Sequence, residues 1–174
     1  MTDAALPRAF LGIAEGKVCS RPMQVQTLLG SCVAVTLHCR ALRCGSIFHA
    51  LLPVAEEYAR DPERRRREIY RYVDTAVRAT LDAMCGLGAR RATLEAKVFG
   101  GACALVDERV GVGLKNVRTA FEALNAAGVR VAASNVGGDR GRKILYYPHT
   151  GEVFVKMLAK PPASAGSGEG PIAI

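Results

Sequence analysis

One cysteine of the chain stands where a nucleophile could be held. Cys32 directly follows Gly30-Ser31, at the junction of two apolar runs of strand length, VQTLL and CVAVTLH. A Gly-Ser pair at such a junction suits a tight bend that aims the next side chain in a special direction. His49 lies in the run CGSIFHALLP, which is expected to form a hairpin with the strand that begins at Cys32. A thiol and an imidazole within hydrogen-bond reach are the parts of a nucleophile and its base.

The backbone of this bend could add a second catalytic feature, because the N–H groups around Gly30, Ser31 and Cys32 could face a developing oxyanion. The pattern alone leaves a plainer alternative open. The chain has six cysteines and three histidines, and a free cysteine in an apolar strand is usually an inert packing residue.

A metal site is a further alternative for the same region. Cys39, Cys44 and His49 could supply part of one, but their spacing is not C-x-x-C and a fourth ligand is not obvious. Structural thiols are therefore favoured, and no metal ligand is assigned.

Two helices are expected beside the strands. Asp61-Pro62-Glu63 offers an N-cap, a proline for the first helical position and an acid in the first turn, and Gly86 is a stop, which predicts one helix between them. A second helix is expected from Leu114 to Ala127. Its apolar face is expected to carry Leu114, Val117, Phe121 and Leu124, with Gly128 at its end.

Further strands are expected over residues 93–99 and 129–136 and in the pair RKILYY and EVFVKML. Many strands with only two substantial helices predict an α+β fold, a layered sandwich in which two main helices pack on a largely antiparallel β-sheet.

The organisation of the chain is that of one domain with a tail. Its 174 residues fit a single domain over residues 1–160, and residues 161–174, PPASAGSGEGPIAI, have the composition of a flexible tail. The N-terminus lacks the apolar stretch of a signal peptide, and no run approaches the length of a membrane span. We therefore expect a cytoplasmic protein with reduced thiols and no membrane insertion.

Six blocks of sequence, taken in order, resemble one known family. They are LLGSCVAVTLH with IFHALLP, then YRYVDTAV, EAKVFGGA, KNVRTAFEAL and SNVGGDRGRKILYYPHTGEVFVK, and they cover nearly all of residues 8–158. In this combination the chain resembles the CheD family, the chemoreceptor glutamine deamidases of bacterial chemotaxis.

The resemblance implies a Cys–His enzyme without a metal or organic cofactor. Such an enzyme hydrolyses the carboxamide of selected glutamines on methyl-accepting chemotaxis receptors to glutamate, releases ammonia, and could also act on glutamyl methyl esters. Cys32 matches the family's nucleophile and His49 its catalytic histidine. The alternative that the resemblance allows is a binding module that regulates a CheC-type chemotaxis phosphatase.

The third catalytic position departs from the family pattern. The family places a threonine six residues before the nucleophile, and here that position is Gln26, whereas Thr27 stands five residues before Cys32. Strand alternation puts Gln26 and Thr27 on opposite faces, so Thr27 is not expected to substitute unless the strand slips or bulges. Gln26 is therefore assigned the third position, because its side-chain carbonyl could accept the imidazole N–H.

The run of four arginines from Arg64 to Arg67 is the main electrostatic feature of a chain with a net charge of +8. A solvated basic face is the favoured interpretation. The sharper alternative is docking onto acidic receptor helices or onto an acidic partner such as a CheC-type phosphatase. Binding of nucleic acid is not expected, because no aromatic residues are interleaved with the arginines.

Overall fold

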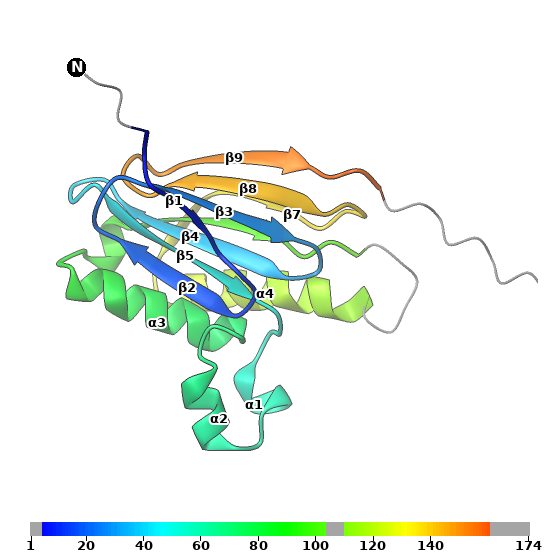
Figure 1. Ribbon diagram of the computed structural model, residues 1–174. Helices are drawn as coiled ribbons and strands as arrows, with labels where there is room; N and C mark the ends of the chain where they lie inside the picture. Colours follow the sequence, from blue (N-terminus) through cyan, green and yellow to red (C-terminus); the bar gives the residue numbers. More distant parts are fainter. Residues whose placement is uncertain (1–4, 104–109, 161–174) are drawn as a thin grey trace, which may run out of the picture.

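Two β-sheets and a layer of helices are stacked in the structure (Figure 1), a computed structural model that describes residues 5–103 and 110–160. The middle layer is a five-stranded sheet with the strand order β2-β5-β4-β6-β7. Its strands are β2 (Glu15–Cys19), β4 (Val33–Cys39), β5 (Cys44–Ala50), β6 (Glu95–Gly100) and β7 (Arg130–Val136). Every residue of β4 and β5 is buried, because the sheet is covered on both faces at its centre.

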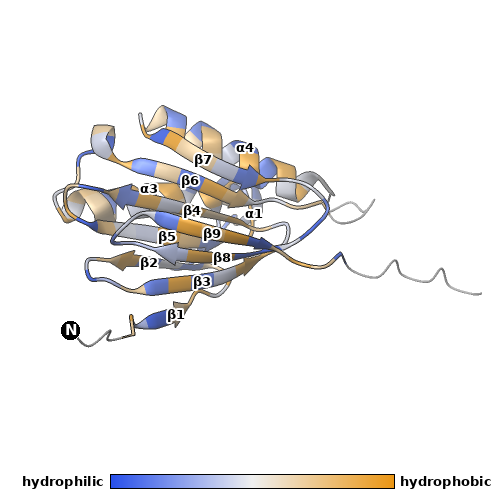
Figure 2. Ribbon diagram, turned by 90° about the horizontal axis from the view of Figure 1, so that it is seen from above, coloured by the Kyte–Doolittle hydropathy of each residue, from blue (hydrophilic) through white to orange (hydrophobic). Residues whose placement is uncertain are grey.

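The outer layer is a four-stranded sheet with the order β1-β3-β8-β9. Its strands are β1 (Arg8–Phe10), β3 (Gln24–Leu29), β8 (Arg142–Tyr147) and β9 (Glu152–Met157). Figure 2 shows β6, β7 and α4 beyond the β9 edge of this sheet, in agreement with the exposure of most of β7.

The helices lie on the opposite face of the five-stranded sheet (Figure 1). α3 (Val73–Gly86) and α4 (Val110–Ala126) are the two main ones, and α1 (Ala55–Tyr58), α2 (Pro62–Arg67) and the 3-10 turn η1 (Arg91–Thr93) are short. Five of the seven strand pairings among the described residues are antiparallel. The predicted α+β sandwich is confirmed. No helix in the described ranges is long and apolar enough to cross a membrane.

The single helix predicted between Asp61 and Gly86 is wrong, because the chain forms α2 and α3 with a break at residues 68–72. The start was predicted correctly: the Asp61 carboxylate accepts a hydrogen bond from the Glu63 N–H at 3.0 Å. The break arises at Tyr72, whose backbone is extended and pairs with Leu52 in a β-bridge. Tyr72 is fully buried there, so tertiary packing interrupts a pattern that fits a helix in sequence.

The second predicted helix is present as α4, but its apolar face was predicted incorrectly at one position. The side chain of Leu114 is 59% exposed, whereas Asn116, Ala120 and Leu124 are fully buried. The helix ends as expected at Gly128, which has a φ of +70°.

The predicted hairpin of β4 and β5 is confirmed, and Ala34 lies opposite His49 in it. The strands β1 and β2 were not predicted, since their residues carry no clear apolar alternation. Residues 161–174 lie outside the described residues, so the flexible tail and the domain limit at residue 160 stay predictions.

The bend at Gly30–Cys32 connects the two sheets, because β3 ends at Leu29 in the outer sheet and β4 begins at Val33 in the middle one. Gly100, at the end of β6, lies against this bend. It has a φ of +107°, and a Cβ at this position would lie 2.1 Å from the carbonyl oxygen of Cys32. Only glycine fits such a position without displacing the bend.

The Gly100→Ala variant is expected to lower the free energy of unfolding by about 1–3 kcal/mol, because of backbone strain, with a further loss from the contact with Cys32. Gly86→Ala is the control, since a Cβ there meets nothing within 4 Å and is expected to change stability by less than about 1 kcal/mol. Urea unfolding of both variants measures the difference. An equal change in the free energy of unfolding for the two variants would contradict the close approach of Gly100 to the Cys32 carbonyl.

Candidate active site

Cys32 and His49 lie on the same face of the five-stranded sheet. His49 is opposite Ala34 in the β4–β5 ladder, and Cys32 belongs to the same buried core cluster as Ala34. This face packs against the outer sheet, where Cys32 belongs to a core with Phe99 and Tyr146. Cys32 is 7% exposed and His49 only 2%. The pair is therefore enclosed between the two sheets.

The outer sheet contributes Thr27 to the same place. The Thr27 hydroxyl oxygen lies 2.9 Å from Nδ1 of His49 and 2.8 Å from the carbonyl oxygen of Leu11. Thr27 is fully buried. The structure thus brings Thr27 and His49 together from two sheets, on the side of the middle sheet where Cys32 lies.

The assignment of Gln26 to the third position is not what the structure shows. Along β3, Val25, Thr27 and Leu29 are buried and point toward the other sheet, whereas Gln26 is half-buried on the opposite face. The prediction that Gln26 and Thr27 lie on opposite faces was right, but Thr27, and not Gln26, contacts His49. The residues from Gly30 to Cys32 form a bend outside both strands, so a count of residues through it does not fix which face of β3 meets His49.

The hydrogen bonds of Thr27 determine the tautomer of His49. A hydroxyl has one proton, and the Leu11 carbonyl can only accept, so the Thr27 proton is donated to Leu11. The Thr27 oxygen must then accept from His49, which places the ring proton on Nδ1. Nε2 is left unprotonated, and it is buried without a hydrogen-bond partner among the described residues.

A strap between β1 and β2 completes this arrangement. The Leu11 N–H donates to the Gln26 carbonyl at 2.8 Å, and the Ala14 N–H donates to the His49 carbonyl at 2.8 Å. Residues 11–14 therefore connect the strand that carries Thr27 with the strand that carries His49. Sequence reasoning missed this strap because its contribution comes from backbone groups.

Burial keeps both members of the pair neutral. It lowers the pKa of His49 to about 4, against the smaller opposing effects of the Leu11 carbonyl and the Glu15 carboxylate. It also raises the pKa of the Cys32 thiol, with its own backbone N–H acting in the opposite direction. The cause is the same for both groups, since a poorly solvated site disfavours the charged form. At neutral pH the site thus holds a thiol and a neutral imidazole.

All three carbonyls of the bend are held from outside. Ala102 N–H donates to Gly30 at 2.9 Å, and Gly101 N–H donates to Cys32 at 2.8 Å. The Asn116 side chain donates to the Ser31 carbonyl at 3.1 Å. In the described part of the chain, no backbone carbonyl accepts from the N–H groups of Ser31 or Cys32. The oxyanion role of the backbone at Gly30 and Ser31 stays a prediction.

The loop at residues 137–138 supports the loop at residues 101–103, which holds the bend. Gly137 N–H donates to the Gly100 carbonyl at 2.9 Å, and Cys103 N–H donates to the Gly138 carbonyl at 2.8 Å. The buried guanidinium of Arg142 donates to the carbonyls of Asn135 and Gly137 and so fixes the loop at residues 137–138. Nothing in the sequence marks Arg142 as buried, because it stands in a basic run between Arg140 and Lys143.

The three residues weighed as metal ligands do not lie together, because His49 is apart from the two cysteines. Cys39 and Cys44 are opposite one another on the face of the sheet that packs on the helices. His49 lies on the other face. No group of three candidate metal ligands occurs within residues 5–103 and 110–160.

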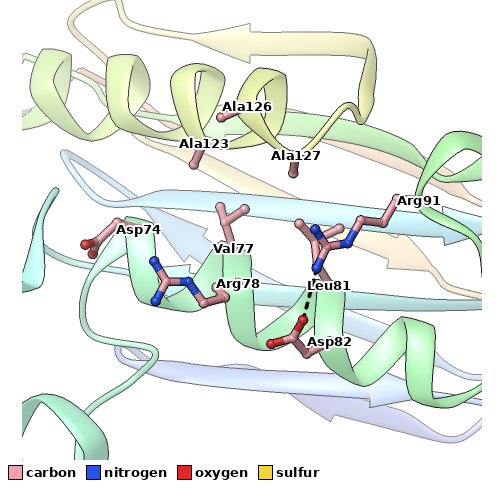
Figure 3. Close-up of a pocket in the computed structure, with 9 residues that line it drawn as sticks. All are labelled: Asp74, Val77, Arg78, Leu81, Asp82, Arg91, Ala123, Ala126 and Ala127. Atoms are coloured by element: carbon pink, nitrogen blue, oxygen red, sulfur yellow. Dashed lines mark hydrogen bonds and ion pairs between the residues drawn. The ribbon is translucent and has the colours of Figure 1, made fainter.

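A groove between α3 and α4 is separate from this site (Figure 3). It lies on the helical side of the five-stranded sheet, and an ion pair of 3.2 Å joins Asp82 and Arg91 across its rim. Its lining residues are Asp74, Val77, Arg78, Leu81, Asp82, Arg91, Ala123, Ala126 and Ala127. Without a thiol or imidazole, this lining cannot perform the chemistry of the enclosed pair.

The arginine run lies on α2, which has no buried residue and projects away from the sheets (Figure 1). Arg64 pairs with Glu68 at 3.1 Å, and Arg66 pairs with Glu63 at 2.6 Å. These contacts are those of a solvated face whose charge is partly neutralised within the chain.

The fold and the site define a class of protein: an α+β sandwich that encloses a thiol and a hydroxyl-bound imidazole between its two sheets. Comparison with known proteins identifies the family. The family described as "CheD chemotactic sensory transduction" matches residues 51–157. The chain belongs to the CheD family.

Relatives match over most of their length. A Geobacter sulfurreducens protein named "Probable chemoreceptor glutamine deamidase CheD 2" is 39% identical over 162 residues, which are 92% of this chain and 96% of that protein. A Maridesulfovibrio salexigens protein named "Probable chemoreceptor glutamine deamidase CheD" is 40% identical over 159 residues, 88% of this chain and 93% of that protein. An archaeal relative of the same name, from Methanococcus maripaludis, is 36% identical over 145 residues, 82% of this chain and 90% of that protein.

The lowered pKa of His49 predicts an acid-dependent loss of stability. Its pKa is about 4 when folded and about 6.5 when unfolded. Above pH 6.5 the imidazole is neutral in both states. As the pH falls from 6.5 to 4, the unfolded chain takes up a proton that the folded chain does not, so stability falls by up to about 3 kcal/mol.

Urea unfolding at pH 7 and pH 4.5 tests this effect. The His49→Gln variant is expected to lose about 2–3 kcal/mol less than the wild type between these pH values, because its side chain does not titrate. An equal loss in both proteins would show that His49 is not the group responsible.

Proposed function

We propose that this chain is a chemoreceptor glutamine deamidase, which hydrolyses selected glutamine side-chain amides of methyl-accepting chemotaxis receptors to glutamate and releases ammonia. The observation that carries the proposal is the hydrogen bond between Thr27 and His49, which leaves Nε2 of His49 as a free base on the face that carries Cys32. The names of the relatives support the choice of substrate.

The reaction begins with attack of the Cys32 sulfur on the amide carbon of the glutamine side chain. Nε2 of His49 takes the thiol proton as the carbon–sulfur bond forms. The imidazolium then gives this proton to the amide nitrogen, the carbon–nitrogen bond breaks, and ammonia leaves. The product of this half-reaction is a thioester between Cys32 and the receptor.

Water completes the cycle. His49 takes a proton from the water as its oxygen attacks the thioester carbon, and the proton passes to the Cys32 sulfur when the carbon–sulfur bond breaks. The receptor leaves with glutamate in place of glutamine. A glutamyl methyl ester would follow the same course, with methanol in place of ammonia.

Each group of the site has a part in these steps. Thr27 holds the Nδ1–H of His49 and stabilises the imidazolium that forms in each half-reaction. The backbone N–H groups of the bend at Gly30 and Ser31 would receive the negative charge on the substrate oxygen. The buried surroundings strengthen these interactions, because water screens them little.

The burial of the site fits a long, slender substrate side chain. Cys32 is the most exposed of the three residues, at 7%, compared with 2% for His49 and 0% for Thr27. Substrate would therefore reach the sulfur first. An unbranched glutamine side chain is narrow enough to suit so enclosed a thiol.

Receptor hydrolysis is favoured over a role restricted to regulation of a CheC-type phosphatase. The resemblance allows this second role, and Gln26 in the third catalytic position gave it added weight. The contact of Thr27 with His49 removes that added weight. Action on the signalling portions of receptors also requires a cytoplasmic protein, so that location belongs to the same proposal.

Mass spectrometry of receptor cytoplasmic fragments tests the proposal. Incubation with the wild type is expected to add about one dalton at each converted glutamine, the difference between an amide and an acid. Cys32→Ala is expected to lower the rate at least about 10³-fold. Cys85→Ala is the matched control, because Cys85 is a free, half-exposed thiol on α3, and it should convert the fragments like the wild type.

Two results would contradict the proposal. One is a wild-type chain that converts no glutamine on any receptor fragment from a bacterium that carries it. The other is equal conversion by Cys32→Ala and the wild type.

A further inference from the structure

Asn116 is a fully buried polar residue on α4 that the chemistry described above does not use. Its side-chain nitrogen donates to two backbone carbonyls, Ser31 at 3.1 Å and Leu51 at 3.0 Å. Ser31 directly precedes the nucleophile, and Leu51 follows His49 by two residues. One amide group therefore joins the two chain segments that carry Cys32 and His49.

Both N–H bonds of this amide are needed for the contact. Each carbonyl can only accept, so the two hydrogen bonds require a group with two donors. A carboxylate has none and a hydroxyl has one. The orientation of the amide follows as well, because its oxygen would repel both carbonyls if it took the place of the nitrogen.

The contact lies where the β-ladder no longer holds the two segments together. The pairing of β4 with β5 ends at Val33 and Ala50. Ser31 and Leu51 lie beyond this last pair, so no ladder hydrogen bond fixes one against the other. At this end of the ladder, next to the catalytic pair, the hydrogen bonds of Asn116 hold Ser31 and Leu51 together.

The packing of α4 fixes the position of Asn116. One turn earlier, a Cβ on Gly113 would lie 3.0 Å from the carbonyl oxygens of Gly101 and Ala102. The neighbouring Val117 fills the space where a Cβ of Gly101 would lie. These two loop residues are the ones that hold the bend by its other carbonyls. Helix α4 thus lies directly on the loop that supports Cys32.

We propose that Asn116 is a positioning residue that sets the geometry of Cys32 against His49. This inference rests on the proposed function, because it assigns the pair a catalytic role. Without the two hydrogen bonds, the bend and the end of β5 can separate, and the sulfur moves relative to Nε2. A displacement of about 1 Å at reacting atoms can lower a rate about 10²-fold.

The variants Asn116→Ala and Asn116→Asp test the proposal, since the first removes the side chain and the second keeps its shape without the two donors. Both are expected to lower kcat for receptor deamidation by about 10²-fold, with KM within about twofold of the wild type. Leu124→Ala is the matched control. Leu124 is as deeply buried on the same helix, and its loss should lower stability but leave kcat of the folded protein unchanged.

Alkylation of Cys32 by iodoacetamide across a range of pH gives a readout that does not depend on deamidase activity. The pH profile is expected to shift in Asn116→Ala and Asn116→Asp and to stay as in the wild type in Leu124→Ala. If Asn116→Ala does not fold, Asn116→Ser carries the test, with one donor retained and an intermediate loss of kcat expected.

The proposal is overturned if the Asn116 variants keep both kcat and the alkylation profile of the wild type, or if they lose activity only in proportion to their unfolded fraction. Failure of the proposed function has a different signature. In that case the wild type converts no glutamine, or Cys32→Ala converts it as fast as the wild type, whatever the Asn116 variants do.

Discussion

The single proton of the Thr27 hydroxyl is the constraint on which the arrangement of the site depends. Because this proton is donated to Leu11, the oxygen must accept from Nδ1 of His49, and Nε2 is left unprotonated to act as the proposed base. Thr27 belongs to the outer sheet and His49 to the middle sheet. The oriented base therefore exists only when the two sheets are packed together, and the bend that leads to Cys32 is the point where the chain crosses between them.

The layers around the contact of Thr27 with His49 position different parts of the site. The outer sheet and the strap at residues 11–14 hold the imidazole. Helix α4 and the loop after β6 hold the carbonyls of the bend that presents the thiol. Enclosure between them keeps the pair neutral, since burial disfavours both the thiolate and the imidazolium. In the proposed reaction, proton transfer from Cys32 to His49 would then accompany attack on the substrate instead of preceding it.

The sequence was sufficient to predict the features that depend on residues close together in the chain. The β4–β5 hairpin, the Asp61 cap and the glycine end of α4 follow from short-range patterns, and the order of CheD-like blocks identified the family. The sequence was not sufficient to predict the features that arise where distant segments of the chain pack together. The choice of Thr27 over Gln26, the burial of Asn116 and Arg142, and the break at Tyr72 depend on packing between elements far apart in the chain. No periodicity within one element records such contacts.

The most direct test of this account compares two adjacent residues of β3 by their effect on kcat for receptor glutamine deamidation. Thr27→Val keeps the shape of the side chain but removes the hydroxyl, and it is expected to lower kcat by about 10²-fold or more, with Thr27→Ser restoring most of the rate. Gln26→Ala is expected to leave kcat within about twofold of the wild type, because its side chain lies on the other face of the strand. A loss of activity in Gln26→Ala together with an unchanged rate in Thr27→Val would contradict the account.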